Sequence, residues 1–201
     1  PREGVPGAAA WRCVDRTGML QRKRAFAYFI SKKAFDIDGL GVKTAELLID
    51  EGTIATFDKV FELQEGDFLS LPGFAELSAK NAVDAIRKAS HDVPLHRVLT
   101  ALSIEHVGEE TARDIADHFR SIDKLAGASE EELRSINGVG DVVAHSIYLW
   151  LREPAHKAML ARLLKHITIA APEKKKATPR SGKTFVFTGT LPTLTREEGQ
   201  E

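Results

Sequence analysis

Four short glycine-containing segments recur along the chain at nearly constant spacing. Each consists of a hydrophobic residue, a variable residue, a glycine, a second hydrophobic residue and a second glycine, with some substitutions. They are Ile37–Gly41, Leu71–Ala75, Ile104–Gly108 and Ile136–Gly140, named hairpins 1 to 4 below. Their last residues stand at 41, 75, 108 and 140, so successive copies are 34, 33 and 32 residues apart. This regular period predicts tandem units that must pack on one another, because so short a unit cannot bury its own apolar surface.

Apolar residues beside the hairpins follow the 3.6-residue period of a helix. Examples are Phe26, Phe29 and Ile30 before hairpin 1, Ala45, Leu48 and Ile49 after it, Leu95, Val98, Leu99 and Leu102 before hairpin 3, and Ala112, Ile115, Ala116 and Phe119 after it. Ser129 and Glu132 have the spacing of a capping box, and Pro154 can start a last helix in which Met159, Leu160, Leu163 and Leu164 face inward. We therefore predict an all-α fold of four tandem helix-hairpin-helix motifs packed as one compact domain, with further β-rich sequence after it.

Composition divides the chain into four parts. The helical domain spans 21–170. Residues 171–182 have the proline, glycine, serine and lysine content of a linker, and 183–201 change to a short β-rich run around Phe185 and Phe187. About twenty residues are too few for a stable strand-based domain, so we expect 183–201 to be a truncated domain start and the chain to be a fragment. Residues 1–20 are interpreted as the remnant of an upstream module.

Two glycines between two helices suit the binding of an anion. Glycine accepts backbone angles that a Cβ disfavours, and without a side chain the backbone can approach a phosphate closely. The hairpin leads into a helix whose first N–H groups lack internal partners and whose macrodipole favours negative charge. Such a site contacts no base, so we expect sequence-independent binding that weakens steeply with salt.

The predicted DNA-backbone contacts come from the hairpin glycines and two lysines that follow them. They are Gly39, Gly41, Lys43, Gly73, Lys80, Gly108, Gly138 and Gly140. Hairpin 2 has Ala75 at its second glycine position, a mild change if the backbone angles there suit alanine, and hairpin 3 has His106 at its first. Glu76 follows hairpin 2 but Lys80 lies a turn further on, whereas Glu109 and Glu110 follow hairpin 3 and Asp141 follows hairpin 4. We therefore expect hairpins 1 and 2 to bind most strongly, then 4, then 3.

The net charge of −1 does not by itself indicate a nucleic-acid partner. The distribution of charged residues along the chain is more informative. Seven lysines and arginines lie between Arg12 and Lys33 against one acid, Asp15, as expected of a surface that binds a polyanion. Two alternatives stay open: this segment is a solvated helix face, or the hairpins are plain connectors in a protein-interaction scaffold.

Several classes of function find no support in the sequence. There is no catalytic set, no Walker phosphate loop and no dinucleotide fingerprint. The single cysteine, Cys13, excludes an intrachain disulfide and fits a cytoplasmic setting. A zinc site takes four ligands, and Cys13 is the one candidate, so zinc binding by this chain is doubtful. No apolar run is long enough for a membrane span, and we expect a monomer.

The order of these parts resembles the C-terminal part of bacterial NAD⁺-dependent DNA ligases. Asp36–Lys43 resembles the family's first hairpin, Ala101–Ala112 its third, and Gly182–Leu191 the start of its BRCT domain; Arg12-Cys13 with Gln21 is similar to the tail of its zinc module. The resemblance implies an enzyme that seals nicks in duplex DNA during replication and repair, with NAD and Mg as cofactors of the parent protein. It also implies a phosphate-binding corner at Thr188 and Gly189.

This chain also departs from the family. The family has a further zinc cysteine five residues after Cys13, where Gly18 stands here. Asp36-Ile-Asp-Gly39 has aspartate where the family's adenylation motif has lysine, so we expect the fragment alone to be inactive and to bind no cofactor. The alternative function is a non-catalytic helix-hairpin-helix module of another repair or junction-processing complex.

Overall fold

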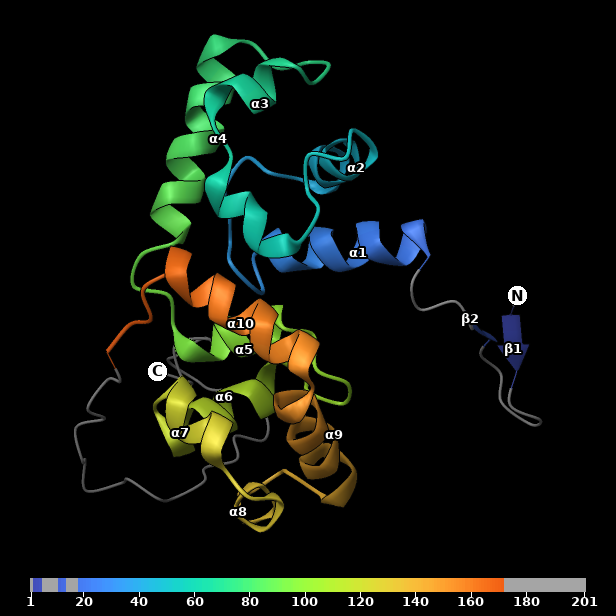
Figure 1. The fold of residues 1–201 in the computed structure, drawn as a ribbon, viewed down its shortest axis with the longest axis vertical. Helices are drawn as coiled ribbons and strands as arrows, with labels where there is room; N and C mark the ends of the chain where they lie inside the picture. Colours follow the sequence, from blue (N-terminus) through green and yellow to red (C-terminus); the bar gives the residue numbers. More distant parts are fainter. Residues whose placement is uncertain (1, 5–10, 14–17, 172–201) are drawn as a thin grey trace, which may run out of the picture.

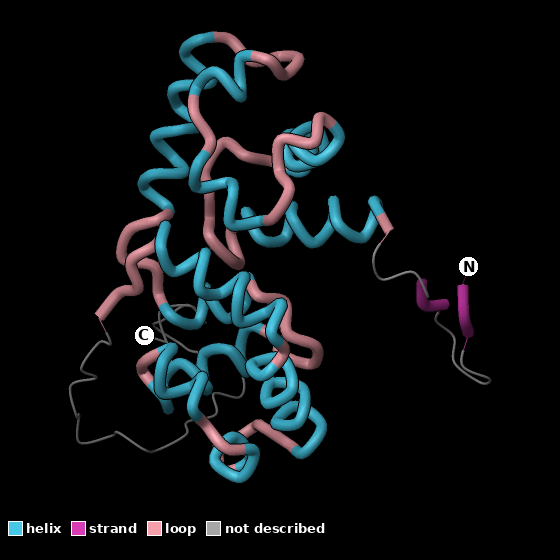
Figure 2. The backbone as a smooth tube through the Cα atoms, viewed as in Figure 1, coloured by secondary structure: helices cyan, strands magenta, loops and turns pink. Residues whose placement is uncertain are grey.

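Each of the four hairpins connects two helices in the computed structural model, which describes residues 2–4, 11–13 and 18–171. The helices are α1 (Met19–Ile30), α2 (Val42–Asp50), η1 (Phe57–Glu62), α3 (Glu65–Leu69), α4 (Glu76–Ala89), α5 (Leu95–Ala101), α6 (Glu109–Phe119), α7 (Ile122–Gly127), α8 (Glu130–Arg134), α9 (Asp141–Arg152) and α10 (Pro154–His166). Figure 2 shows helices joined by loops throughout residues 18–171. Ahead of them, strands β1 (Arg2–Gly4) and β2 (Trp11–Cys13) pair antiparallel, with Glu3 opposite Arg12.

The helices form two units that each contain two hairpins. In the first unit α1 packs on α2 and α3 on α4; in the second α5 packs on α6 and α8 on α9. Figure 1 shows the first unit in the upper half of the view and the second in the lower half, with α10 crossing between them. The predicted all-α architecture of 18–171 is confirmed, whereas the boundaries of the four predicted parts stay predictions.

The predicted apolar stripes form the core. Phe26, Leu48, Val98, Ile115 and Leu163 are among the side chains with almost no exposed surface. One repeated signal was missed: an alanine stands four residues after the second glycine position of every hairpin. Ala45, Ala79, Ala112 and Ala144 are all fully buried. A side chain this small lets the second helix of each motif pack closely against its neighbours.

The two units are held together by the segment that follows α10. The Thr168 amide donates to the Ser90 carbonyl at 2.8 Å, and the Val93 amide donates to the Thr168 carbonyl at 2.8 Å. The Ala170 amide in turn donates to the Val93 carbonyl at 2.9 Å. Residues 167–170 therefore pair with the connection between the units, 90–94, as a short extended segment.

A buried ion pair fastens α10 to η1. The Nε of Arg162 lies 3.2 Å from Oδ2 of Asp58, whose side chain is only 1% exposed, while Arg162 remains 42% exposed. The other oxygen of Asp58, Oδ1, has no hydrogen-bond partner within the described part of the chain. Arg162 is therefore the main compensation for a carboxylate removed from water.

Local predictions about helix starts also hold. Ser129 Oγ accepts from the Glu132 amide at 3.2 Å, and Glu132 Oε2 accepts from the Ser129 amide at 2.8 Å, which confirms the capping box. Pro154 is the first residue of α10, and Leu160 and Leu163 are buried. None of the helices in the described ranges is both long and apolar enough to cross a membrane. The linker after Ala171 and the β-rich run at 183–201 lie outside the described residues.

Replacing Arg162 with alanine should lower the free energy of unfolding by about 2 kcal/mol, because it leaves the buried Asp58 carboxylate uncompensated. Urea denaturation would measure the change. Arg87→Ala is the matched control, since Arg87 and Asp84 form an exposed pair on α4; its loss should stay below about 0.5 kcal/mol. Equal losses in the two variants would show that the Arg162–Asp58 pair does not stabilise the fold.

Candidate nucleic-acid interface

All four hairpins share one backbone turn. In each, the amide of the fourth residue donates to the carbonyl of the first, at 3.2, 3.3, 3.1 and 3.1 Å in hairpins 1 to 4. The residue after this turn is the N-cap of the next helix, and its carbonyl accepts the first helical hydrogen bond at 2.9 to 3.0 Å. The repeated sequence thus specifies a repeated geometry, from the turn to the start of the helix.

The first glycine position has left-handed backbone in every hairpin. The φ angles are +75° at Gly39, +88° at Gly73, +67° at His106 and +81° at Gly138. Glycine adopts this conformation without steric cost, whereas another residue loses about 1–2 kcal/mol there. Hairpin 3 therefore keeps the turn although His106 is strained by it.

The second glycine position has a different role. Its φ is −92° at Gly41, −123° at Ala75, −91° at Gly108 and −81° at Gly140, with ψ near 180° throughout. This is extended backbone that any residue adopts, so Ala75 fits without strain, as the sequence suggested. A Cβ added at Gly41, Gly108 or Gly140 would meet no atom within 4 Å. Within the described residues, neither backbone angle nor internal packing requires these glycines, so the backbone at these positions is open to close approach.

The turns lie at the surface, and all the predicted glycines are exposed. Helices α2, α4, α6 and α9 begin directly after them, and the first amides of a helix lack intrahelical acceptors. Hairpin 2 differs in one detail that the sequence analysis missed. Ser78 Oγ accepts from the Ala75 amide at 2.8 Å, so this N-cap amide already has a partner.

Hairpins 1 and 2 border one groove. A depression of about 610 Å³ is lined by Asp38 and Gly39 from hairpin 1, by Gly73 and Phe74 from hairpin 2, and by residues of α4, including Ser78. A single extended ligand lying in this groove could contact both turns. In the second unit, a Cβ at Gly138 would lie 3.5 Å from Asp114 Oδ2, so hairpin 4 faces α6.

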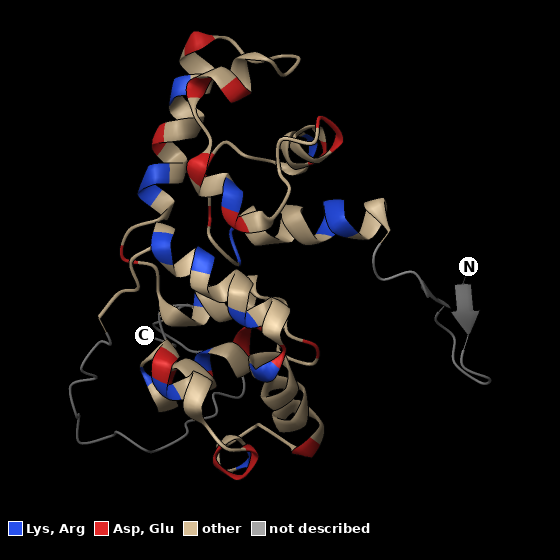
Figure 3. Cartoon of the chain, in the orientation of Figure 1, with Lys and Arg blue, Asp and Glu red and all other residues tan. Residues whose placement is uncertain are grey.

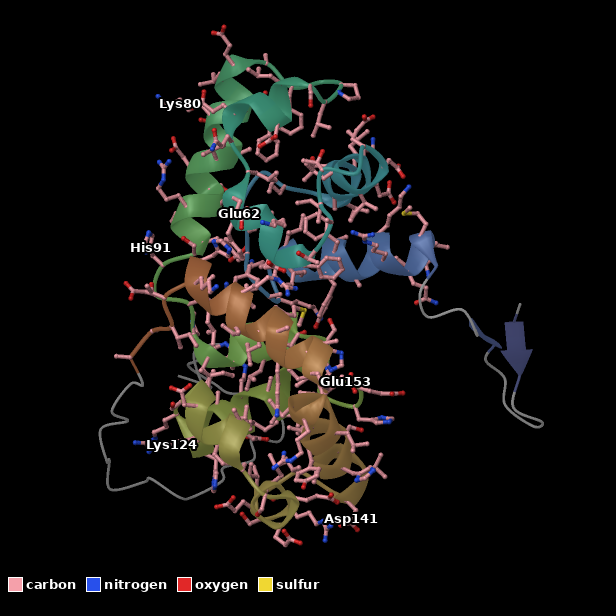
Figure 4. The ribbon with its side chains drawn as sticks, in the orientation of Figure 1. Glu62, Lys80, His91, Lys124, Asp141 and Glu153 are labelled. Atoms are coloured by element: carbon pink, nitrogen blue, oxygen red, sulfur yellow. The ribbon has the colours of Figure 1, made fainter. Side chains whose placement is uncertain are left out.

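The two predicted lysines stand beside this pair of hairpins. Lys43 is the second residue of α2 and Lys80 lies one turn into α4, at the outer edge of that helix in Figure 4. Both are exposed, and within the described residues neither has a recorded ion-pair partner. Their charge is thus available to an anion at hairpin 1 or 2.

An acid begins the helix after hairpin 2, Glu76, and after hairpins 3 and 4, where the acids are engaged in ion pairs. Glu109, the first residue of α6, lies 2.6 Å from Lys33 Nζ, and Asp141, the first residue of α9, lies 3.2 Å from Arg134 Nε. The hydrogen bond to Glu109 raises the pKa of Lys33. Figure 3 shows acidic residues gathered around α8, next to hairpin 4, and Figure 4 shows Asp141 at the start of α9. The predicted order of binding strength is not tested by this arrangement and stays a prediction.

Cys13 is the last residue of β2, and Thr188 and Gly189 lie outside the described residues. Within the described ranges, no group of three or more His, Cys, Asp or Glu side chains could hold a metal ion. The expectation that Cys13 alone does not hold zinc stays a prediction.

Gly39→Ala and Gly41→Ala form a matched pair, since neither added Cβ would touch an atom within 4 Å. Gly39→Ala should lower the free energy of unfolding by about 1–2 kcal/mol because of its positive φ. Gly41→Ala should instead raise the free energy of unfolding by about 0.4–1 kcal/mol, because extended backbone accepts alanine and alanine lowers the entropy of the unfolded chain. Urea denaturation of both variants provides the comparison, and equal losses would contradict the different roles of the two positions.

Comparison with known protein families agrees with this geometry. The model of a SAM-like helix-hairpin-helix tandem matches residues 32–88, which cover hairpins 1 and 2. A model of the helix-hairpin-helix motif matches residues 97–160, which cover hairpins 3 and 4. The chain therefore carries helix-hairpin-helix motifs in both of its units.

Proposed function

We propose that this chain binds the sugar-phosphate backbone of duplex DNA without reading its sequence. The observation that carries the proposal is the groove shared by hairpins 1 and 2, with glycine turns from both motifs on its walls. Helix-hairpin-helix motifs, which match both units, are known for sequence-independent DNA binding.

The mechanism follows from the two glycine positions. The left-handed residue turns the chain sharply, and the open glycine at the next helix start allows a phosphate oxygen to approach the backbone amides. Lys43 and Lys80 then add positive charge next to hairpins 1 and 2. Amides and lysines contact phosphates rather than base edges, so affinity depends on charge and salt instead of sequence.

We further propose that the module is the duplex-gripping part of an NAD⁺-dependent DNA ligase. This finer assignment depends on the sequence resemblance at Asp36–Lys43, Ala101–Ala112 and Gly182–Leu191. NAD and Mg would be bound by a separate adenylation domain, and the role of this chain would be to bind the nicked DNA. The alternative is a non-catalytic module of another repair or junction-processing complex.

Lys43→Glu should weaken binding to two short duplexes of unrelated sequence by the same factor. It should also flatten the slope of log affinity against log salt by about one, because one phosphate contact is lost. Fluorescence anisotropy over a salt series measures both quantities. Lys157→Glu is the control, since it makes the same charge change at an exposed site on α10.

The outcomes separate the alternatives. A similar flattening by Lys157→Glu would point to a general charge effect rather than a hairpin contact. A loss confined to one sequence would contradict backbone binding. No measurable affinity for either duplex at low salt would favour the protein-interaction scaffold.

The ligase assignment has its own test in the coding sequence that precedes the codon for Pro1. It should specify a Lys-x-Asp-Gly motif, because this family joins DNA through an adenylated lysine. The complete product should then seal nicked duplex when NAD⁺ and Mg²⁺ are supplied. An open reading frame without the motif would favour the non-catalytic alternative while leaving backbone binding unaffected.

A further inference from the structure

A second groove lies between the two units and shares no lining residue with the groove at hairpins 1 and 2. Its volume is about 240 Å³, and its walls carry Lys32 and Lys33 from the turn after α1, Arg97 from α5, and Arg113 from α6. Among the described residues, Glu109 is the one carboxylate in the lining. Residues from both units thus bring four basic side chains to one groove, and Glu109 pairs with Lys33 among them.

Glu109 shows how an oxyanion sits in this groove. Its Oε1 lies 2.6 Å from Lys33 Nζ, the distance of a strong charge-assisted hydrogen bond. Both side chains keep access to water, with 62% of Lys33 and 39% of Glu109 exposed. An external anion can therefore reach Lys33 and compete with the carboxylate.

The other cations are weakly engaged. Lys32 is exposed and has no recorded ion pair within the described residues. Arg97 Nη1 lies 3.3 Å from Asp36 Oδ2, and Arg113 Nε lies 4.0 Å from Glu110 Oε1, a carboxylate that is 92% exposed. Ion pairs this accessible to water contribute little to stability, so an incoming dianion can replace them at little cost.

His96 also lines the groove but adds no charge at neutral pH. Burial lowers its pKa, and the neighbouring Arg113 and Arg97 lower it further. The positive charge of the groove therefore comes from its lysine and arginine side chains. Arginine in particular suits phosphate, because its planar fork can donate two parallel hydrogen bonds.

We propose that this groove, which lies beside the start of α6 after hairpin 3, is a phosphate-binding site built from side chains of both units rather than from hairpin amides, and that Glu109 competes with the ligand for Lys33. The phosphate comes from the DNA backbone or from a free polyphosphate. The DNA source rests on the proposed function, whereas the polyphosphate source does not. In either case the two units hold the phosphate jointly, since lysines come from one unit and arginines from the other.

Isothermal titration of the whole chain with inorganic pyrophosphate tests the site directly. Glu109→Gln should tighten pyrophosphate binding by roughly three- to tenfold, because it removes the competing charge and releases Lys33. The double variant Arg97→Gln/Arg113→Gln should abolish it. Glu65→Gln is the matched control, as Glu65 is likewise the first residue of a helix, α3, and should leave the affinity unchanged.

A short duplex gives the second arm of the experiment. Tighter duplex binding by Glu109→Gln, with a salt slope steeper by about one, assigns the groove to the DNA backbone. Tighter pyrophosphate binding with unchanged duplex binding assigns it to a free polyphosphate. The proposal would be overturned if neither the unaltered chain nor Glu109→Gln bound pyrophosphate. It would also be overturned if Glu65→Gln tightened pyrophosphate binding as much as Glu109→Gln does. These measurements do not depend on the Lys43→Glu experiment. The proposed binding of phosphates by the hairpin amides can therefore fail while the groove proposal holds, or the reverse.

Discussion

The hydrogen bond that closes each hairpin turn, from the fourth residue to the first, sets the geometry on which the candidate interface depends. It requires left-handed backbone at the third residue, where three hairpins have glycine and the other has His106. The same turn places the next residue as the N-cap of a helix, so the helix amides start at the surface. One backbone constraint, repeated four times, therefore fixes both the direction of each second helix and the exposure of its first N–H groups.

Pairing of the motifs turns these separate helix starts into an extended surface. Hairpins 1 and 2 share a groove, and the two units are joined by α10, by the extended segment 167–170 and by ion pairs such as Lys33–Glu109. The four hairpins have the same backbone conformation but differ in the charged side chains beside them. Within the described residues, Lys43 and Lys80 beside hairpins 1 and 2 have no ion-pair partner. An acid begins the helix after hairpins 2, 3 and 4, and Glu109 and Asp141 at hairpins 3 and 4 pair with basic side chains of the same chain.

Much of the fold could be predicted because its information is local and periodic. Helical stripes, the capping box at Ser129 and the tolerance of Ala75 follow from neighbouring residues and from the repeat. Contacts between distant residues could not be predicted, since they depend on how the units dock. Arg162 and Asp58 are 104 residues apart, and Asp92 and Thr168 are 76 apart. For the same reason the groove at Lys33 was missed: its lysines and arginines meet only after both units have folded.

The central claim, that the hairpin amides hold DNA phosphates, is tested most directly by following backbone amide resonances during titration with a short duplex. We predict that the amides of residues 39–43 and 73–77 shift first, and to the same extent for two unrelated sequences. Amides of α10 should stay unchanged under the same conditions. Shifts confined to side chains or to other surfaces, with the hairpin amides unaffected at saturating duplex, would contradict the account.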